Sequence, residues 1–502
     1  MRSTFMGLET NKRGLYAQQS GLYTTGNNIS NANTLGYTRQ RVNMQATTGL
    51  ASQPGLLGTG VQASSIQRIR DSFVDNQFRQ ESNKLGYWES RSKAISQLED
   101  IVGEPSEYGL QKSLSEFWSS LQNLSTNPSD SGARAVVVQR GQNVAEAFNH
   151  IHSSLTEAQA NVGKEISFAT KNINSLLKQI GDMNGEISRV EASGYLPNEL
   201  YDQRDLLLDE LSTYLPIETT YEKNGGNASS ISEGMVTVSL KLKDGNKIEL
   251  VKGKEPSGTD SMDPIKLIYS EKNLIQGIKI NVAGEIKATD ETDETDEVAE
   301  SVISHSDFLN SGKLKSLMDS YGTADGNGLY PEMINDLNKM AKAFAFKFNE
   351  AHIDGVDLDN TQGKPFFIAK ENEEITAGNI SVYQSIIDDP RKIAASNSVG
   401  EIGNAENVKD LLETLSFPMN DLKVIIGTLG ASGQQAERMA INTATLQGAA
   451  SNRRDSISSI SLDEEMTDMI RFQQAYNASA RMITVIDETL DKIINGMGIA
   501  GR

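Results

Sequence analysis

Apolar residues recur every seven positions at both ends of the chain. Near the N-terminus this repeat consists of Leu8, Leu15, Leu22 and Ile29. Near the C-terminus it consists of Leu462, Met469, Tyr476, Ile483, Leu490 and Met497, with Phe472, Ile486 and Ile493 at the intervening heptad position. An apolar stripe that repeats every 3.5 residues on a helix is the requirement for coiled-coil packing. We therefore predict that these residues form an assembly interface, within one subunit or between subunits, although an ordinary bundle with amphipathic terminal helices has the same periodicity.

The two predicted terminal helices differ in their intrinsic stability. Gly7, Gly14 and Gly21 each precede a leucine of the N-terminal repeat, and each costs about 1 kcal/mol against alanine in a helix interior. This helix is therefore expected to become ordered only on assembly, where the glycines allow neighbouring backbones to approach closely. The C-terminal helix is predicted from Leu462 to Asn495, because Ser461 and Glu464 have the spacing of a capping box.

The pattern between the ends changes twice. Residues 71–215 have apolar positions three and four apart, which predicts helices. After Pro216 the pattern alternates and predicts two hairpins, 235–242 with 248–251 around Asp244-Gly245, and 265–269 with 278–282. Helical spacing returns at 313, over 331–349 and over 406–455, with loops and short strands expected over 355–397.

We therefore predict a mainly α, elongated fold with an inserted β domain. Its parts are a terminal coiled-coil domain (1–60 and 456–502), a helical rod domain (61–215 and 305–455) and a β-rich outer domain (216–304). The chain would run out and back like a radial spoke, with its ends nearest an assembly axis.

Four segments resemble one family of bacterial proteins. The string NNISNANTLGYTR at 27–39 closely resembles the N-terminal signature of the flagellar axial proteins, which are rod, hook and hook-associated subunits. Three further segments are similar to the hook-associated branch that joins hook to filament: FWSSLQNLSTNPSD (117–130), PNELYDQRD (197–205), and SLDEEM (461–466) with RFQQAYNASAR (471–481). Residues 220–300 have no counterpart in this resemblance.

The resemblance implies a structural adaptor at the hook-filament junction. Its implied partners are further copies of the chain in a ring, hook protein on one side, and a second hook-filament junction protein on the other. It also implies a location outside the cell on the flagellum, reached through the flagellar type III export apparatus without a cleaved signal peptide. A flagellar export chaperone is expected to bind Met469, Phe472, Tyr476 and Ile483, because the C-terminal stripe would otherwise aggregate before assembly.

Composition excludes several other classes of protein. The 502 residues include no cysteine, which excludes disulfides and thiolate metal sites. The net charge of −20 argues against nucleic-acid binding, and no segment reaches the ~18 apolar residues of a membrane span. The residues of a locally basic region are expected to be paired or solvated rather than to bind a polyanion: Arg39, Arg41, Arg68, Arg70 and Arg79.

The residues that carry chemistry predict no catalytic, cofactor or metal site. His305 and His352 stand alone in the sequence, and Asp354, Asp357 and Asp359 lack the glycine and glutamate of an EF-hand loop. The acidic run 290–297 is expected to be an exposed loop, with calcium capture the less favoured alternative. Phe344, Phe346 and Phe348 are expected to pack in the core.

Two other functions stay open at this point. One is a hook or rod structural subunit of the same family. The other is a cell-wall glycan hydrolase on an axial-protein scaffold, in which Glu464 and Glu465 would be the paired acids, although acids at a helix N-terminus are explained more simply by the helix dipole.

Overall fold

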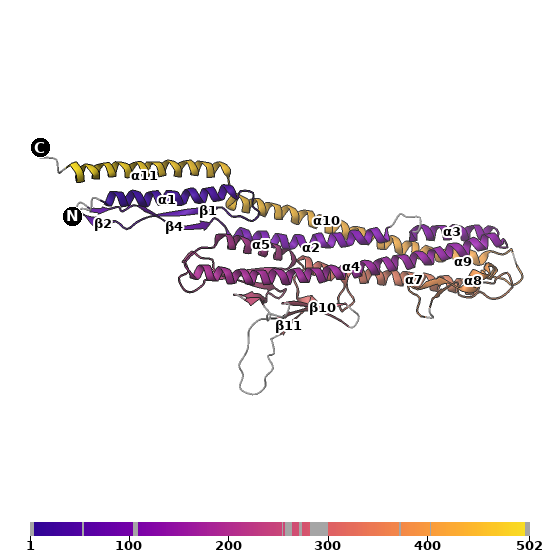
Figure 1. The fold of residues 1–502 in the computed structure, drawn as a ribbon. Coiled ribbons are helices and arrows are strands. Elements are labelled where there is room, and N and C mark those ends of the chain that lie inside the picture. Colours follow the sequence, from indigo (N-terminus) through magenta and orange to yellow (C-terminus); the bar gives the residue numbers. More distant parts are fainter. Residues whose placement is uncertain are drawn as a thin grey trace, which may run out of the picture.

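The computed structural model describes residues 5–52, 55–103, 109–253, 255–256, 264–270, 274–281, 300–370, 373–401 and 403–496. It shows an elongated molecule in which the first and last helices lie side by side at one end (Figure 1). The acidic run 290–297, Val282 and Met497 lie outside the described residues. No helix within the described ranges combines the length and apolar character that crossing a membrane requires.

Helices form the body of the molecule, as the apolar spacing predicts. They are α2 (Ser72–Val102), α3 (Leu110–Thr126), α4 (Ser131–Ala192), α5 (Asn198–Tyr214), α6 (Lys313–Tyr321), α7 (Leu329–Asp354), α8 (Gln384–Asp388), α9 (Glu406–Thr414) and α10 (Ser416–Ser458). The N-termini of two long helices are capped, since Asp71 accepts a hydrogen bond from the Phe73 amide and Asp130 accepts one from the Gly132 amide. The prediction of a mainly α fold is confirmed.

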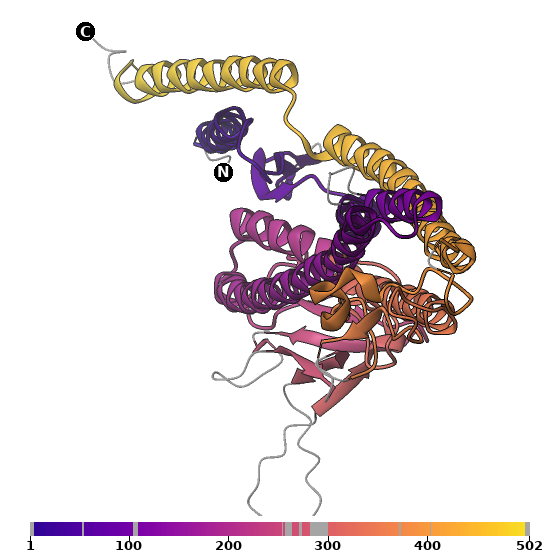
Figure 2. The same cartoon turned by 90° about the vertical axis from the view of Figure 1, so that its right-hand side faces the viewer.

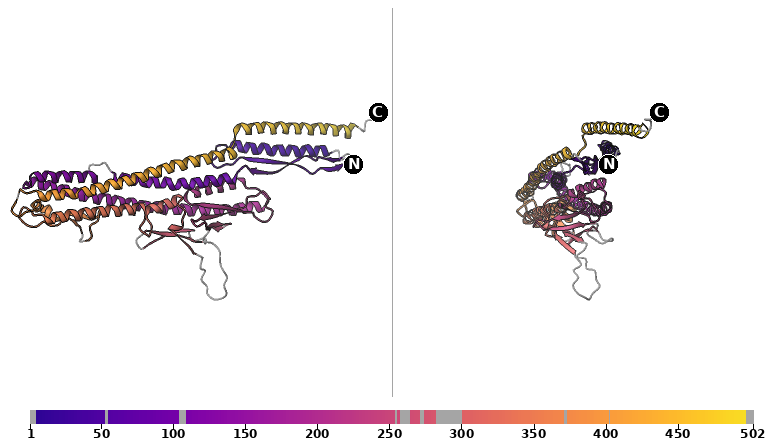
Figure 3. Two further views of the ribbon diagram at one scale, coloured as in Figure 1. Left: turned by 180° about the vertical axis from the view of Figure 1, so that it is seen from behind. Right: turned by 90° about the vertical axis from the view of Figure 1, so that its left-hand side faces the viewer.

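The 62-residue helix α4 is the spine of this body. At 1.5 Å per residue it is about 93 Å long, and Figures 2 and 3 show the other rod helices and the sheets arranged along it. Fully buried side chains line it in heptad steps, for example Ile166, Ile173, Ile180 and Ile187. One apolar core therefore runs through the rod.

Two small antiparallel sheets lie against α4. The first contains β5 (Ile217–Glu222), β6 (Met235–Lys241), β7 (Lys247–Lys252) and β8 (Glu255–Pro256) in that order, and the second contains β11 (Glu300–Ser304), β10 (Ile275–Asn281) and β9 (Ile265–Tyr269). The pairs β6-β7 and β9-β10 confirm the two predicted hairpins. The sheets share their core with α4. Residues 215 and 305 therefore mark a change of secondary structure within one apolar core. The division of the chain into three domains stays a prediction.

Shorter strands complete the fold. β12 (Phe367–Ala369) pairs with β13 (Ile380–Val382) in the region where short strands are expected. Near the N-terminus, β1 (Gln40–Ala46) pairs with β4 (Val61–Arg68), and β2 (Leu50–Ser52) pairs with β3 (Gly55–Leu57). This long hairpin lies beneath the terminal helices (Figure 1).

Two asparagines of α4 fasten one sheet each to the helix. Asn184 donates from Nδ2 to the carbonyls of Val236 (2.8 Å) and Gly253 (2.6 Å) and accepts from the Val236 amide (3.0 Å). Asn174 makes the same reciprocal pair with the backbone of Ile265, at 2.9 Å in each direction. Both asparagine side chains are buried. They therefore supply the hydrogen bonds that water would otherwise make to the backbone groups of the strands facing α4.

We expect Asn184→Ala to destabilise the fold. The substitution leaves the buried Val236 amide and two carbonyls unpaired, and an unsatisfied buried polar group costs about 1–3 kcal/mol. Urea unfolding followed by circular dichroism should show a lower midpoint for this variant. Gln179→Ala is the control, because Gln179 is an exposed residue of the same helix and, among the described residues, its side chain bonds only to Ser175 of that helix. Equal midpoints for the two variants would contradict the proposed role of Asn184.

Candidate assembly interface

Helices α1 (Met6–Ser30) and α11 (Leu462–Gly496) pack antiparallel within one chain. Their contacts keep a single register in steps of seven residues. A β-carbon added to Gly7 would lie 3.4 Å from Cδ1 of Ile486, one on Gly14 would lie 3.4 Å from Oγ of Ser479, and one on Gly21 would lie 2.9 Å from Cδ1 of Phe472. The next step pairs Asn28 with Glu465, whose side chains are hydrogen bonded at 3.1 Å.

The glycine column of α1 therefore faces α11, and the leucine column lies beside it. Leu8, Leu15, Leu22 and Ile29 are all only partly buried. On α11 the partly buried residues of the predicted interface are Met469, Phe472, Tyr476, Ile483, Ile486 and Leu490. Leu462 and Ile493 stay exposed, with 50% and 45% of their surface open. Each helix thus covers only part of the other's apolar stripe.

A buried polar cluster joins the end of α1 to the start of α11. Asn28 donates to the carbonyl of Gln40 (2.9 Å) and accepts from the Gln40 amide (3.1 Å), so it fixes the turn that follows α1. Arg39 donates from Nε to Glu465 and from Nη1 to Glu464, both at 2.7 Å, and its amide bonds the carbonyl of Ser458. Burial, with the carboxylates of Glu199, Asp202 and Glu465, raises the pKa of Tyr37, which bonds Asn28.

Arg39 also changes the interpretation of the paired acids. Glu465 is buried with Arg39 and Asn28 as partners, so a structural charge pair accounts for it. Among the described residues, Ser461 and Glu464 do not make the reciprocal contacts of the predicted capping box. The Glu464 carboxylate instead accepts a hydrogen bond from Arg39.

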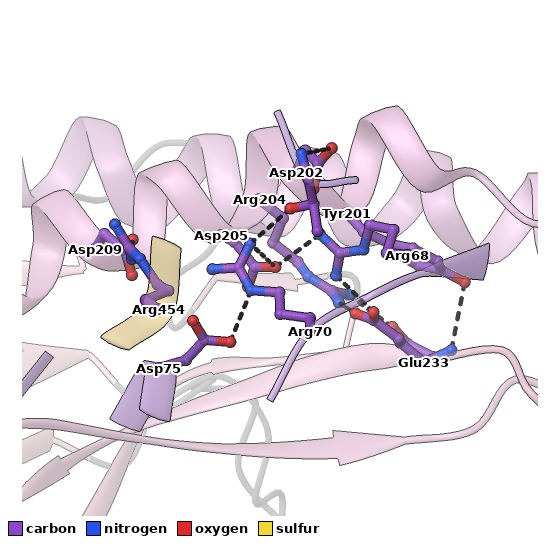
Figure 4. Close-up of polar contacts among 12 residues, drawn as sticks. Arg68, Arg70, Asp75, Tyr201, Asp202, Arg204, Asp205, Asp209, Glu233 and Arg454 are labelled. Atoms are coloured by element: carbon purple, nitrogen blue, oxygen red, sulfur yellow. Dashed lines mark hydrogen bonds and ion pairs between the residues drawn. The ribbon is translucent and has the colours of Figure 1, made fainter. Parts of the chain in front are cut away.

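A second cluster, which we call the ionic joint, connects the β1-β4 hairpin to the rod (Figure 4). Its cations and anions come from β4, the segment between β4 and α2, α2, α5 and the segment before β6. They are Arg68, Arg70, Arg79 and Arg204 with Asp75, Asp202, Asp205, Asp209 and Glu233.

Asp205 is the centre of the ionic joint. Its carboxylate accepts ion pairs from Arg68 (2.9 Å), Arg70 (3.2 Å) and Arg79 (3.0 Å). Burial disfavours its charge, but Arg70, Arg68 and Arg79 outweigh this effect and hold the pKa of Asp205 well below its usual range. Asp209 extends the cluster to Arg79 and to Arg454 of α10.

The ionic joint explains most of the basic region near the N-terminus. Arg39, Arg68, Arg70 and Arg79 are all paired with carboxylates, whereas Arg41 is exposed. The partners on α5 were not recognised from the sequence. The available signal was the mixture of charges in the segment 201–209, where Asp202, Arg204, Asp205 and Asp209 fall on neighbouring turns of one helix.

The remaining candidate chemistry is structural. His352 and His305 both have hydrogen-bond partners in the fold: Nε2 of His352 accepts from the Ala394 amide (3.0 Å), and Nε2 of His305 lies 2.6 Å from Oδ1 of Asp319. Burial lowers the pKa of His352 to about 4. Asp357 accepts from the amides of Asp359 and Thr361 and so closes a turn.

The aromatic series on α7 is only partly in the core. Phe344 and Phe348 are buried, but Phe346 is 68% exposed, so its predicted core position is wrong. The spacing explains this result, because residues two apart on a helix point to different sides. Across the described ranges, no group of three or more His, Cys, Asp and Glu side chains is placed to hold a metal ion.

Family comparisons match the chain in three sections. The flagellar hook-associated protein FlgK helical domain matches residues 95–367. The flagella basal body rod protein family matches residues 8–38, and the flagellar basal body rod FlgEFG protein C-terminal family matches residues 454–496. The two rod matches therefore fall on α1 and α11, and the helical-domain match falls on the rod and the β insertion.

Individual relatives carry one name. Flagellar hook-associated protein 1 of Bacillus subtilis strain 168 is 42% identical over 527 aligned positions that cover 100% of both chains. The protein of that name from Salmonella typhimurium strain LT2 is 27% identical over 83% of this chain and 71% of its own length. The solved flagellar hook junction protein FlgK from Burkholderia pseudomallei aligns with 59% of this chain and 46% of its own, at 20% identity and a TM-score of 0.45. Since the helical-domain match covers more than half of the residues and the Bacillus relative aligns from end to end, this chain belongs to the flagellar hook-associated protein 1 family.

Proposed function

We propose that this chain is a structural adaptor that joins the flagellar hook to the filament and assembles through α1 and α11. The observation that carries the proposal is the partial burial of the two terminal apolar stripes. Burying apolar surface yields about 25 cal/mol per Å², so contacts with neighbouring subunits that cover the remaining surface stabilise the assembly. The neighbours we propose are further copies in a ring, hook protein on one side and the second hook-filament junction protein on the other.

The two alternatives have less support. The rod families match only the terminal segments, whereas the hook-associated helical domain matches 95–367. For the wall hydrolase, the candidate acids Glu464 and Glu465 are both bound by Arg39. We therefore infer a role without catalysis. The family membership supports a place on the flagellum outside the cell, reached through type III export.

A chromosomal deletion of the gene tests the junction role. We expect electron microscopy of the deletion strain to show hooks that carry no filament, because the adaptor between them is missing. Complementation with the full chain should restore filaments. Cells that lack hooks altogether would favour a hook or rod subunit instead.

The glycine column gives a sharper test of the terminal helices. Gly21→Val would place side-chain carbon against the Phe472 ring, and overpacking of this kind costs about 1–3 kcal/mol. We expect fewer filaments per cell and smaller motility halos. Gly26→Val is the matched control, because a β-carbon at Gly26 has nothing within 4 Å among the described residues, and it should leave both readouts close to those of the parent. Equal defects in the two variants would show that helix propensity, and not the contact with α11, is responsible.

We further propose that a flagellar export chaperone covers the α11 stripe before assembly, with Met469, Phe472, Tyr476 and Ile483 as anchors. Ile483→Asp should weaken binding of the chaperone to a peptide of residues 455–502 in a calorimetric titration, because a charge then enters an apolar contact. Thr484→Asp adds the same charge at the next, exposed position and should bind like the parent peptide. Unchanged affinity for Ile483→Asp would place the chaperone elsewhere.

A further inference from the structure

The sequence contains four Asn-Gly pairs: Asn184-Gly185, Asn224-Gly225, Asn327-Gly328 and Asn495-Gly496. Such a pair can lose ammonia without an enzyme, because the amide nitrogen of the glycine can attack the side-chain carbonyl carbon of the asparagine. Glycine has no side chain to obstruct this attack. The reaction closes a succinimide ring, which takes the asparagine backbone out of a helical conformation, and water then opens the ring to aspartate or isoaspartate.

Three of these four pairs are held against the reaction by contacts in the fold. Asn184 is buried within α4, and its side chain makes three hydrogen bonds to backbone groups. The side-chain nitrogen of Asn224 donates to Glu191 (2.6 Å). Asn495 lies at the end of α11, where its side-chain nitrogen donates to Asp491 (2.6 Å). Ring closure would break these side-chain hydrogen bonds, and within the two helices it would also disturb those of the backbone.

Asn327 is not held in this way. It is exposed in the turn between α6 and α7, outside any helix. Among the described residues, its side chain has no hydrogen-bond partner. Its backbone carbonyl accepts a hydrogen bond from the amide of Thr323 at 2.8 Å. The turn therefore restrains the backbone and leaves the side-chain amide of Asn327 accessible to solvent.

The fold requires the glycine of this pair. Gly328 has a φ of 144°, and a β-carbon there would lie 2.5 Å from Cα of Gly322 and 3.2 Å from the carbonyl oxygen of Asp319. Only glycine fits so close to another backbone in this conformation. The close approach of Gly328 to the end of α6 therefore keeps an unobstructed amide nitrogen next to Asn327.

A carboxylate lies on the nitrogen that would attack. The Gly328 amide donates to Oε1 of Glu332 at 3.1 Å, and Glu332 is an exposed residue of the first turn of α7. This contact satisfies an amide at a helix N-terminus, where the helix itself offers no partner. It also meets the condition for a general base, which must lie within about 2.6–3.2 Å of the atom whose proton it takes.

We propose that Asn327-Gly328 is a site of spontaneous deamidation and that Glu332 is the base for the reaction. Glu332 takes the proton of the Gly328 nitrogen while this nitrogen forms a bond to Cγ of Asn327. The bond between Cγ and Nδ2 then breaks, and the proton passes from Glu332 to the leaving nitrogen, which departs as ammonia. Water hydrolyses the succinimide, so residue 327 becomes aspartate or isoaspartate.

The modification changes a turn that attaches the second sheet to the rod. The Ile275 amide of β10 donates to the carbonyl of Gly322 (3.1 Å), and the Ala324 amide donates to the carbonyl of Ile275 (2.9 Å). Isoaspartate adds a methylene group to the backbone and converts the carbonyl that Thr323 binds into a free carboxylate. The attachment of β10 is therefore weakened in a fraction of molecules that grows with the age of the protein.

Peptide mapping by mass spectrometry tests the proposal on the full-length protein. During incubation at neutral pH, the peptide that contains Asn327 should gain the mass difference between an amide and a carboxylic acid. This conversion should be at least about tenfold faster than at Asn184, Asn224 and Asn495, because a positioned base accelerates only the first of these reactions. Equal rates at all four pairs, or a faster conversion at another pair, would overturn the proposal.

Glu332→Gln separates the action of the carboxylate from the conformation of the turn. Glutamine still accepts a hydrogen bond from Gly328 but cannot take its proton. We expect deamidation at Asn327 to slow by about tenfold or more, since a positioned base contributes about 10²–10⁴-fold. Glu350→Gln is the matched control, because it removes the same charge from another exposed position of α7, and it should leave the rate at Asn327 unchanged. An unchanged rate in a folded Glu332→Gln variant, checked by circular dichroism, would refute the role of Glu332.

Unfolding the parent protein in urea gives a comparison that does not depend on the folding of a variant. Unfolding separates Glu332 from Gly328 and removes the contacts that protect the other three pairs. The preference for Asn327 should therefore disappear, and its own rate of deamidation should fall. A rate at Asn327 that stays the same or rises on unfolding would show that the folded turn does not promote the reaction.

Discussion

The buried contact between the β1-β4 hairpin and the rod centres on the charge of Asp205. Three arginines from two chain segments converge on this one buried carboxylate, and its loss would leave Arg68, Arg70 and Arg79 short of compensation in a dry environment. Breaking a buried ion pair by removing one partner typically costs about 3–5 kcal/mol. Such pairs contribute little net stability compared with apolar packing, but they tolerate few alternative geometries. The ionic joint therefore attaches the hairpin to the rod through several buried ion pairs at once.

Local patterns in the sequence were sufficient to predict the helices and the two hairpins. The helices of the rod follow from apolar spacing along α4 and α7, and the turn at Asp244-Gly245 follows from residues that suit a positive φ, which Gly245 adopts at 87°. Apolar spacing and turn residues act between neighbours in the sequence, so they can be recognised without knowing the rest of the fold. The terminal heptads likewise identified α1 and α11 as amphipathic helices.

The glycines of α1 predicted a close approach of a neighbouring backbone, but the sequence could not show that α11 of the same chain is that neighbour or in which register the two helices pack. A leucine stripe and a glycine stripe lie next to each other on the helix, and hydrophobicity alone favours the leucines. The structure places the glycines at the contact because their lack of a side chain lets Phe472 and Ile486 approach the backbone. The ionic joint was also out of reach, because Arg68 and Glu233 meet Asp202 and Arg204 only after the hairpin, α5 and the insertion have folded together.

The pairing of α1 with α11 also has a consequence for the order of folding. These helices come from opposite ends of the chain, so their contact closes a loop that contains nearly every other residue. The entropic cost of closing a loop grows with its length, and contacts of such high sequence separation form slowly. Because its glycines lower the intrinsic stability of α1, this helix is not expected to form before it contacts α11. We therefore expect the rod to fold first, since this shortens the effective loop to residues 31–67 between α1 and the ionic joint and residues 455–461 between Arg454 and α11.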